Sequence, residues 1–230
     1  FGNSVYPKTM NNIVNEGAIT IQDAAKEDLT FKHGYIQTYG IAYGVSMRAG
    51  DDIPTVTNCT NRGPLSVGKI TNATTGNGGR LYMAGLFSNI YAGNISDCTN
   101  EATGTITAKT GLWSTEYMIG GFVTYIGSNT NSDTIKITDC ENKAAILCDP
   151  YIDDNNTILK GEIGGFCGEA YVDSNADTYH VEFLRAKNSG NVTVKGKFVT
   201  SGYPYFGGFM GAANYDSLFF TDCEVSGTTD

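Results

Sequence analysis

One short sequence motif recurs along this chain about every 40 residues, and it constrains the fold more than any other feature. The copies are centred on Cys59, Cys98 and Cys140, and we align Leu184 and Cys223 with them. The intervals between these positions are 39, 42, 44 and 39 residues. A period of this length indicates one structural unit stacked on copies of itself, so we expect about five repeats of roughly 41 residues.

A glycine-rich motif recurs in step with the first. A glycine followed by an apolar side chain, usually Phe, stands at the same phase of four repeats, at Gly85, Gly121, Gly165 and Gly208. Glycine weakens the interior of a strand, and there it normally marks a bulge or the close approach of another part of the chain. We therefore predict that these four are structural glycines in a packed interior, and that substitution by valine destabilises the array.

A third motif follows the cysteine positions, as in Asn61-Arg62-Gly63 and Asn188-Ser189-Gly190. Asparagine and glycine tolerate the left-handed backbone region, so this motif predicts a sharp corner between strands. Segments such as Ile135–Ile137 alternate apolar and polar residues, as half-buried strands do. Apart from a short helical pattern over 23–29, the sequence predicts an all-β protein.

The repeat runs through residues 1–230 without a linker, which predicts a single elongated domain. We divide it into an irregular first unit (1–52), regular repeats (53–217) and a truncated last repeat (218–230). The start at Phe1 is typical of a trimmed chain. For the incomplete last repeat we expect a longer parent protein, and closure of this end by another element is the alternative. No apolar run is long enough to predict a transmembrane segment.

The net charge is −9 with only 15 basic residues, and this composition argues against binding to nucleic acid. Acidic residues gather in expected loops, at Asp51–Asp52, Asp153–Asp154, Asp173 and Asp177. A solvated surface explains them, and calcium bound to one of these loops is the alternative. None of them has the spacing of an EF-hand loop. We therefore predict no cofactor and assign no calcium site.

Six cysteines would suit a disulfide framework, but four of them share one phase of the repeat. Because Leu184 is aligned with that phase, we interpret Cys59, Cys98, Cys140 and Cys223 as an apolar interior ladder of free thiols. Parallel Cβ vectors also make the dihedral angle of a disulfide hard to reach. Cys148 and Cys167 lie off the ladder, and the sequence leaves open whether they pair.

No catalytic constellation stands out. The two histidines, His33 and His180, lie at unrelated phases of the repeat, so neither has an evident nucleophile as its partner. Paired carboxylates for glycoside hydrolysis cannot be ranked among so many acidic residues. We therefore expect a protein without enzymatic activity and predict no catalytic residue and no metal site.

The Gly-Gly-Phe segments, each followed by a strand and a Cys-x-Asn corner, resemble the GLUG-type repeats of bacterial cell-surface proteins. The resemblance covers about residues 10–227, with Phe in place of the usual Leu, added cysteines and longer loops. It implies a right-handed parallel β-helix, or solenoid, and location at the bacterial cell surface or in the secreted fraction, within an envelope-attached protein. Antiparallel blades stacked as a prism or propeller are the structural alternative.

The same resemblance implies a scaffold, stalk or adhesin segment whose partner is a glycan or a host surface protein. A polysaccharide lyase or glycoside hydrolase is the alternative, because such enzymes use parallel β-helices, although fold analogy is a weak argument. Among the variable loops, Tyr91, Tyr171 and Tyr215 follow the glycine motif by similar distances. We expect them to form one row, either as a structural stack or as a ligand-binding platform for sugar rings.

Overall fold

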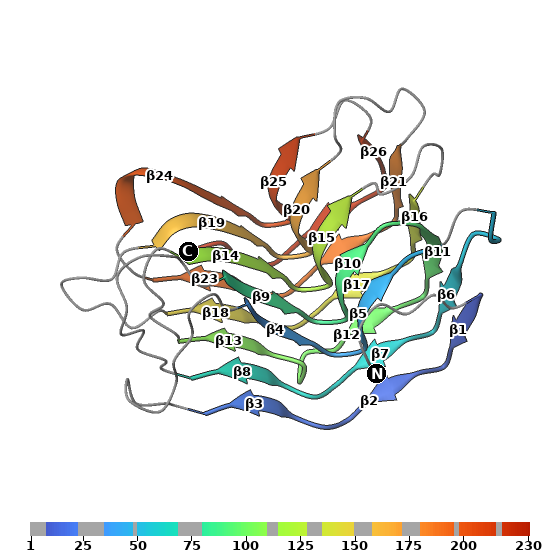
Figure 1. Ribbon diagram of the computed structural model, residues 1–230, viewed down its shortest axis with the longest axis horizontal. Helices are drawn as coiled ribbons and strands as arrows, with labels where there is room; N and C mark the ends of the chain where they lie inside the picture. The colour runs from blue at the N-terminus through green and yellow to red at the C-terminus, as the bar shows by residue number, and fades with distance from the viewer. Residues whose placement is uncertain are drawn as a thin grey trace.

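A computed structural model shows a solenoid built from short parallel strands (Figure 1). It describes residues 8–22, 35–47, 50–68, 80–109, 115–127, 135–149, 158–171, 180–195, 198–214 and 218–230. Five strands make one coil, and equivalent strands of successive coils pair in parallel to form five sheets. The protein is therefore a right-handed parallel β-helix, as the resemblance of the repeats implied, and each full coil holds five strands. The helical pattern over 23–29 falls outside the described residues.

We number the sheets in the order in which one coil passes through them. Sheet 1 contains β1 (Thr9–Asn11), β6 (Thr55–Thr57), β11 (Gly93–Ser96), β16 (Ile135–Thr138), β21 (Val181–Leu184) and β26 (Leu218–Thr221). Sheet 2 contains β2 (Val14–Asn15), β7 (Thr60–Asn61), β12 (Thr99–Asn100), β17 (Glu141–Asn142), β22 (Lys187–Asn188) and β27 (Glu224–Val225). Sheet 3 contains β3 (Ile19–Ile21), β8 (Leu65–Val67), β13 (Ile106–Ala108), β18 (Ile146–Cys148) and β23 (Val192–Val194).

Two further sheets complete each coil. Sheet 4 contains β4 (Tyr35–Tyr39), β9 (Arg80–Ala84), β14 (Thr115–Gly120), β19 (Ile158–Gly164) and β24 (Phe198–Gly207). Sheet 5 contains β5 (Ala42–Val45), β10 (Phe87–Ile90), β15 (Val123–Gly127), β20 (Cys167–Tyr171) and β25 (Met210–Asn214). The first unit, predicted to be irregular, pairs in the same register as the others, for example Met10 with Val56.

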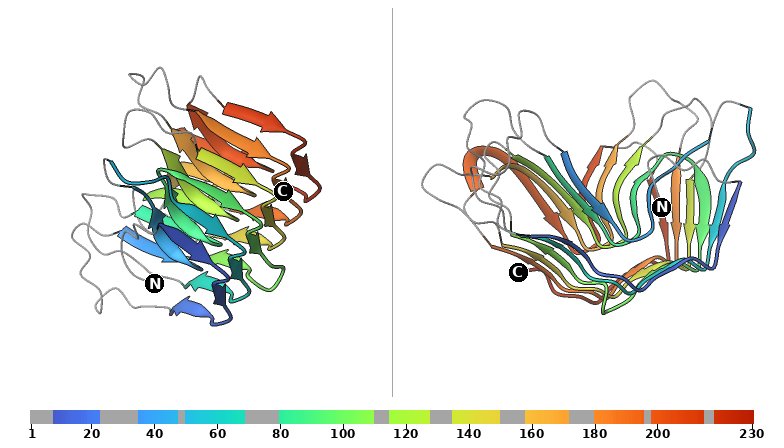
Figure 2. Two further views of the ribbon diagram at one scale, coloured as in Figure 1. Left: turned by 90° about the vertical axis from the view of Figure 1, so that its right-hand side faces the viewer. Right: turned by 60° about the horizontal axis from the view of Figure 1, so that its bottom comes forward.

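The cross-section of the solenoid has two lobes (Figure 2, right). Sheets 1, 2 and 3 form a continuous curved layer, and sheets 4 and 5 meet above it in a V. One apolar core fills the lobe between sheets 5 and 1, where Phe122 stacks on Phe166 with ring centroids 4.5 Å apart. A second core fills the lobe between sheets 3 and 4 and includes Leu65, Leu81 and Tyr117. The waist between the two lobes is polar.

A row of asparagines occupies this waist, and we call it the asparagine ladder. It consists of Asn15, Asn61, Asn100, Asn142 and Asn188, one from each strand of sheet 2 in the first five coils. The Nδ2 atom of each one donates a hydrogen bond of 2.7–2.9 Å to the Oδ1 atom of the next. From Asn61 onward these side chains are at most 1% exposed, so the ladder satisfies amides that would otherwise be buried without partners.

The recurring glycines lie opposite the ladder, at the corner between sheets 4 and 5. A Cβ atom on Gly121 would meet the carbonyl oxygen of Gly165 and the amide of Asn142, and Gly85 and Gly165 have equivalent neighbours. At Gly208, in the last of these coils, the neighbour is instead the side chain of Val225. Only a residue without a side chain permits this approach of backbone to ladder, which is the physical reason for the repeated glycine.

The sequence predicted the left-handed corner at the Asn-x-Gly motif. In the structure it lies one residue before each cysteine position. The residues with positive φ angles of 52–57° are Asn12, Asn58, Asp97, Asp139, Arg185 and Asp222. Because Arg185 aligns with Asp139, the residue equivalent to Cys140 is Ala186, and Leu184 pairs with Thr138. The alignment of Leu184 with the cysteines was therefore wrong by two residues. Ala186 is fully buried, so the position remains apolar.

All six cysteines carry free thiols, including Cys148 and Cys167. Cys59, Cys98 and Cys140 lie in successive coils, and the backbone N–H of Cys59 donates to the Sγ atom of Cys98 over 3.4 Å. A side-chain hydrogen bond with the Cys98 thiol, followed by burial, raises the pKa of the Cys59 thiol. Burial raises the pKa of Cys148 to about 12. Thiols held neutral in this way are poor nucleophiles and serve as small apolar side chains.

Candidate functional site

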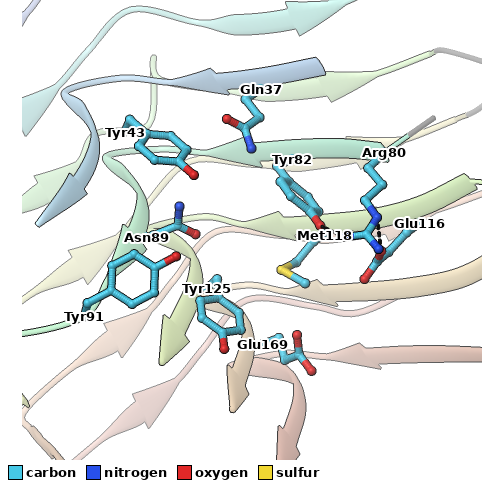
Figure 3. A pocket seen from close by; sticks show the side chains of 10 residues that line it. All are labelled: Gln37, Tyr43, Arg80, Tyr82, Asn89, Tyr91, Glu116, Met118, Tyr125 and Glu169. Atoms are coloured by element: carbon cyan, nitrogen blue, oxygen red, sulfur yellow. Dashed lines mark hydrogen bonds and ion pairs between the residues drawn. The ribbon is translucent and has the colours of Figure 1, made fainter. Parts of the chain in front are cut away.

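A groove runs along the solenoid between sheets 4 and 5, on the open side of the V. The corner that forms it is sharp, since a Cβ atom on Gly120 or Gly164 would meet the carbonyl oxygen of Val123 or Cys167 in the next strand. Sheet 5 therefore folds back beside sheet 4 instead of continuing its plane. The side chains that point away from the two cores face each other across a cavity of about 540 Å³ (Figure 3).

We call this cavity the tyrosine groove. Its lining comes from four successive coils and consists of Gln37, Tyr43, Arg80, Tyr82, Asn89, Tyr91, Glu116, Met118, Tyr125 and Glu169. Neighbouring coils are about 4.8 Å apart, so the three steps from the first coil to the fourth span about 14 Å. The groove thus has the length of a short stretch of a polymer, and its four tyrosines make it strongly aromatic.

Strand alternation places these side chains in rows. On sheet 4, Gln37, Tyr82 and Met118 are register partners and all line the groove. The next partner of Met118 is Glu162, which is only 2% exposed. On sheet 5, Asn89, Tyr125 and Glu169 are register partners in the same way. The two walls therefore present different residues in every coil.

An ion pair lies on the sheet 4 wall of the tyrosine groove. The Nε atom of Arg80 lies 2.8 Å from the Oε2 atom of Glu116, and its Nη1 atom donates a hydrogen bond of 3.2 Å to the hydroxyl of Tyr82. Figure 3 shows Arg80 and Glu116 on one side of the groove and Tyr43, Asn89 and Tyr91 on the other. Arg80 is held in place by these contacts, which fixes the position of the Tyr82 hydroxyl.

The tyrosines of sheet 5 form a partly buried cluster. The ring centroids of Tyr91 and Tyr125 are 6.1 Å apart and their planes are inclined by 59°. Burial, followed by the nearby carboxylate of Glu169, raises the pKa of Tyr125. Burial, followed by the proximity of Tyr43, raises the pKa of Tyr91. These phenols therefore remain protonated at neutral pH and can both donate and accept hydrogen bonds.

The three tyrosines that the sequence singled out have different surroundings. Tyr91 lines the groove. Tyr171 is 37% exposed, and its register partner in the preceding coil of sheet 5 is Gly127. Because Ile90 pairs with Ile126, Tyr91 is level with Gly127, so a coil without an aromatic separates Tyr91 from Tyr171. Tyr215 falls outside the described residues. The ring that adjoins Tyr91 is Tyr125, which the sequence did not single out.

A second cavity, of about 400 Å³, lies at the left-handed corners on the opposite side of the molecule. Asp139 accepts two hydrogen bonds of 2.6 Å from Arg185, and these lower the pKa of its carboxyl group. Both side chains are more than 40% exposed. Such a solvated pair adds little stability and has no neighbouring aromatic among the residues that line the cavity, so we assign it no ligand.

Among the residues that the structure describes, no three His, Cys, Asp or Glu side chains come together as a group that could hold a metal ion. Of the acidic loops considered for calcium, Asp51–Asp52 is exposed, and Asp52 lies 3.4 Å from the amino group of Lys8. The other acidic loops and His33 fall outside the described residues. His180 lies at the start of a sheet 1 strand, 3.1 Å from Glu182.

Sequence reasoning missed most of the tyrosine groove, including Tyr43, Tyr82, Tyr125, Glu116 and Glu169. A signal was present in the strands themselves. On both sides of each glycine corner, apolar residues that face the cores alternate with residues that vary from coil to coil, as in Arg80-Leu81-Tyr82-Met83. The outward-facing residues of the two strands that flank a glycine corner therefore differ from coil to coil. Such variation indicates a surface whose residues are not fixed by the packing of the fold.

Comparison with protein-family models, curated proteins and solved structures gives no match. The similarity to GLUG-type repeats therefore rests on the motifs alone. Within the described residues, no helix is long and apolar enough to cross a membrane.

Proposed function

We propose that this chain is a non-enzymatic glycan-binding module of a secreted or cell-surface protein, and that an extended glycan lies in the tyrosine groove. The observation that carries the proposal is the groove itself, with four tyrosines from three successive coils along one concave face. The resemblance to GLUG-type repeats supports the extracellular context and an adhesin-like role.

Both the chemistry and the shape of the groove suit sugars. A pyranose ring has apolar C–H faces that pack on aromatic rings, while its hydroxyls need fixed donors and acceptors. The groove offers aromatic surface at Tyr91 and Tyr125 and polar groups at Gln37, Asn89 and Glu169. Its length of about 14 Å, three inter-coil steps, would accommodate several units of a chain.

The test is a glycan array with the wild type and three variants. We expect Tyr125→Ala to weaken binding at least about tenfold, because loss of a central aromatic contact costs more than about 1.4 kcal/mol. Tyr171→Ala tests whether the ligand extends beyond the groove. Phe219→Ala removes an exposed aromatic ring on sheet 1 and should change nothing. Failure of every glycan to bind, or binding that Tyr125→Ala leaves intact, would contradict the proposal.

One observation favours glycoside hydrolysis as a second candidate function. Glu162 on sheet 4 and Glu169 on sheet 5 belong to the same coil, and Glu116 belongs to the coil before it. Glycosidases need two carboxyl groups on opposite sides of the bond they cleave. Release of new reducing ends from any bound polysaccharide, abolished by Glu162→Gln, would favour this activity over binding alone.

A further inference from the structure

The C-terminal end of the solenoid presents an apolar surface. The strands β24, β25, β26 and β27 each stand last in their sheets, at the end of the stack opposite β1, β2 and β3 (Figure 1). Residues 228–230 complete the last coil by hydrogen bonding to β23, for example from the N–H of Val192 to the carbonyl oxygen of Thr228 over 2.8 Å. We call the surface that these four strands and residues 228–230 present along the solenoid axis the end face.

Core positions are open to solvent on the end face. In the core between sheets 5 and 1, Phe183 is 1% exposed, whereas its register partner Phe220 in the last coil is 49% exposed. Cys167 is fully buried, whereas its register partner Met210 is only half-buried. The last coil therefore has apolar side chains at positions where the capping unit of a repeat protein has polar ones.

The waist is apolar at the end face as well. Val225 occupies the position of the asparagine ladder in the last coil, as the register partner of Asn188, and it is 47% exposed. It points inward, since a Cβ atom on Gly208 would lie 2.9 Å from its Cγ1 atom. The Nδ2 atom of Asn188 donates to the carbonyl oxygens of Gly190 and Gly208. The ladder therefore ends with its last amino group satisfied, and a valine replaces the next amide.

The N-terminal end of the solenoid is different. There the core positions between sheets 5 and 1 are covered, since Met10, in the row of Phe220, is 5% exposed and Ile41 is 2% exposed. The waist at this end carries the amide of Asn15, whose Oδ1 atom accepts a hydrogen bond from the backbone N–H two residues later. Contact between Val225 and Asn15 would set an apolar group against a polar one, so the two ends do not match each other.

We propose that two copies of this chain associate through their end faces, about a two-fold axis perpendicular to the solenoid axis. An open sheet edge is a template for pairing with another chain, and a two-fold axis sets the same surface of each copy against the other. The edge strands would run antiparallel across this axis, an arrangement in which backbone groups can pair. These strands are 10, 5, 4 and 2 residues long, and together they reach the size of a standard interface, about 20–30 residues a side.

This association leaves the tyrosine groove accessible. The groove is lined by residues of the first four coils, whereas the end face belongs to the fifth coil and the strands that follow it. A dimer therefore holds two grooves, and a polymer that reached both would bind with the avidity of linked sites. The pairing of the end faces does not depend on what the groove binds.

Analytical ultracentrifugation of the 230-residue chain tests the association. We expect the mass of two chains at about 10 µM protein, since interfaces of standard size have a Kd of about 1 µM or lower. A reducing agent is present throughout, so that the half-exposed thiol of Cys223 cannot cross-link two copies. A monomer at every concentration, or assemblies that grow beyond the dimer, would overturn the proposal.

Two matched variants locate the interface. Val225→Asp places a carboxylate in the end face, and we expect the Kd of the dimer to rise at least about tenfold, because an unpaired charge is costly to bury. Val14→Asp adds the same charge at the opposite end, at a valine that is 48% exposed, and should leave the Kd unchanged. Circular dichroism checks that both variants are folded. A dimer that survives Val225→Asp, or equal weakening by the two variants, would rule out pairing through the end faces.

Discussion

Two rows of residues run along the axis of this solenoid, and they differ in how much they vary from coil to coil. The asparagine ladder in the waist has the same residue in five successive coils. The row on sheet 4 that faces the tyrosine groove has five residues of four kinds, Gln37, Tyr82, Met118, Glu162 and Tyr205.

The contrast has a physical cause. Each ladder amide must meet the same atoms of the next coil inside a closed interior, so any substitution leaves buried polar groups without partners. A residue on the groove wall is limited only by the strand that carries it. The repeated residues therefore define the architecture, and the residues that depart from the repeat define the surface available for binding.

The strongest challenge to this contrast is Asn100→Ala. The Nδ2 atom of Asn100 donates to Gly121 and Asn142, and its Oδ1 atom accepts from Asn61. The substitution leaves three buried groups without a hydrogen-bond partner. Each such group costs about 1–3 kcal/mol, so we expect the free energy of unfolding to fall by about 3–5 kcal/mol. Chemical denaturation measures this loss. Asn94→Ala, on the exposed side of the same coil, is the control and should be nearly neutral.

Substitution at the glycine corner should have the next largest effect. In Gly121→Ala the new Cβ atom meets the backbone of Gly165 and the amide of Asn142, and we expect a loss of about 2–3 kcal/mol from overpacking. Gly44→Ala is the matched control, because its Cβ atom would lie 3.7 Å from the nearest neighbour, an ordinary contact. Equal melting temperatures for the two variants would show that the corner does not require glycine.

The free energy of unfolding, measured at a series of alkaline pH values, tests whether the buried Cys148 thiol in the second core stays neutral. Burial raises the pKa of Cys148 from 9.0 to about 12, so between these values the unfolded chain has lost a proton that the folded chain keeps. Stability should therefore fall as the pH rises above 9, by about 1.4 kcal/mol per pH unit for this thiol. Cys148→Val should remove this part of the slope, and Val194, its register partner, shows that the row accepts valine. Identical slopes for the two proteins would contradict the prediction.

The smallest effect is expected on the groove wall. Gln37→Ala removes an amide side chain from the groove row, and its effect on the free energy of unfolding should be within about 0.5 kcal/mol, as for most surface substitutions. Asn61→Ala removes an amide from the ladder in the next coil and provides the comparison. A large loss of stability in Gln37→Ala, measured by thermal denaturation, would show that the groove wall is structural.

The sequence predicted the parallel stack and the close packing at the glycines because both repeat at one phase in every coil. It misplaced Leu184 because the alignment followed the ends of strands, whereas the register depends on the left-handed residue, here Arg185. Asn188, two residues after Ala186 as Asn61 is after Cys59, was the signal that would have corrected it. The tyrosine groove could not be predicted in the same way, since its residues do not repeat and its walls meet only through the corner geometry.

The asparagine ladder also has a direction. Every Nδ2 atom donates towards the C-terminal end of the solenoid, so the amide dipoles are aligned head to tail. Hydrogen bonds in such chains polarise one another, and each bond is strengthened by those on either side of it. A coil in the middle of the stack is therefore held more firmly than a coil at an end. The groove draws its lining from the first four coils, and Tyr125 and Glu116 belong to the third, where this mutual polarisation acts from both directions.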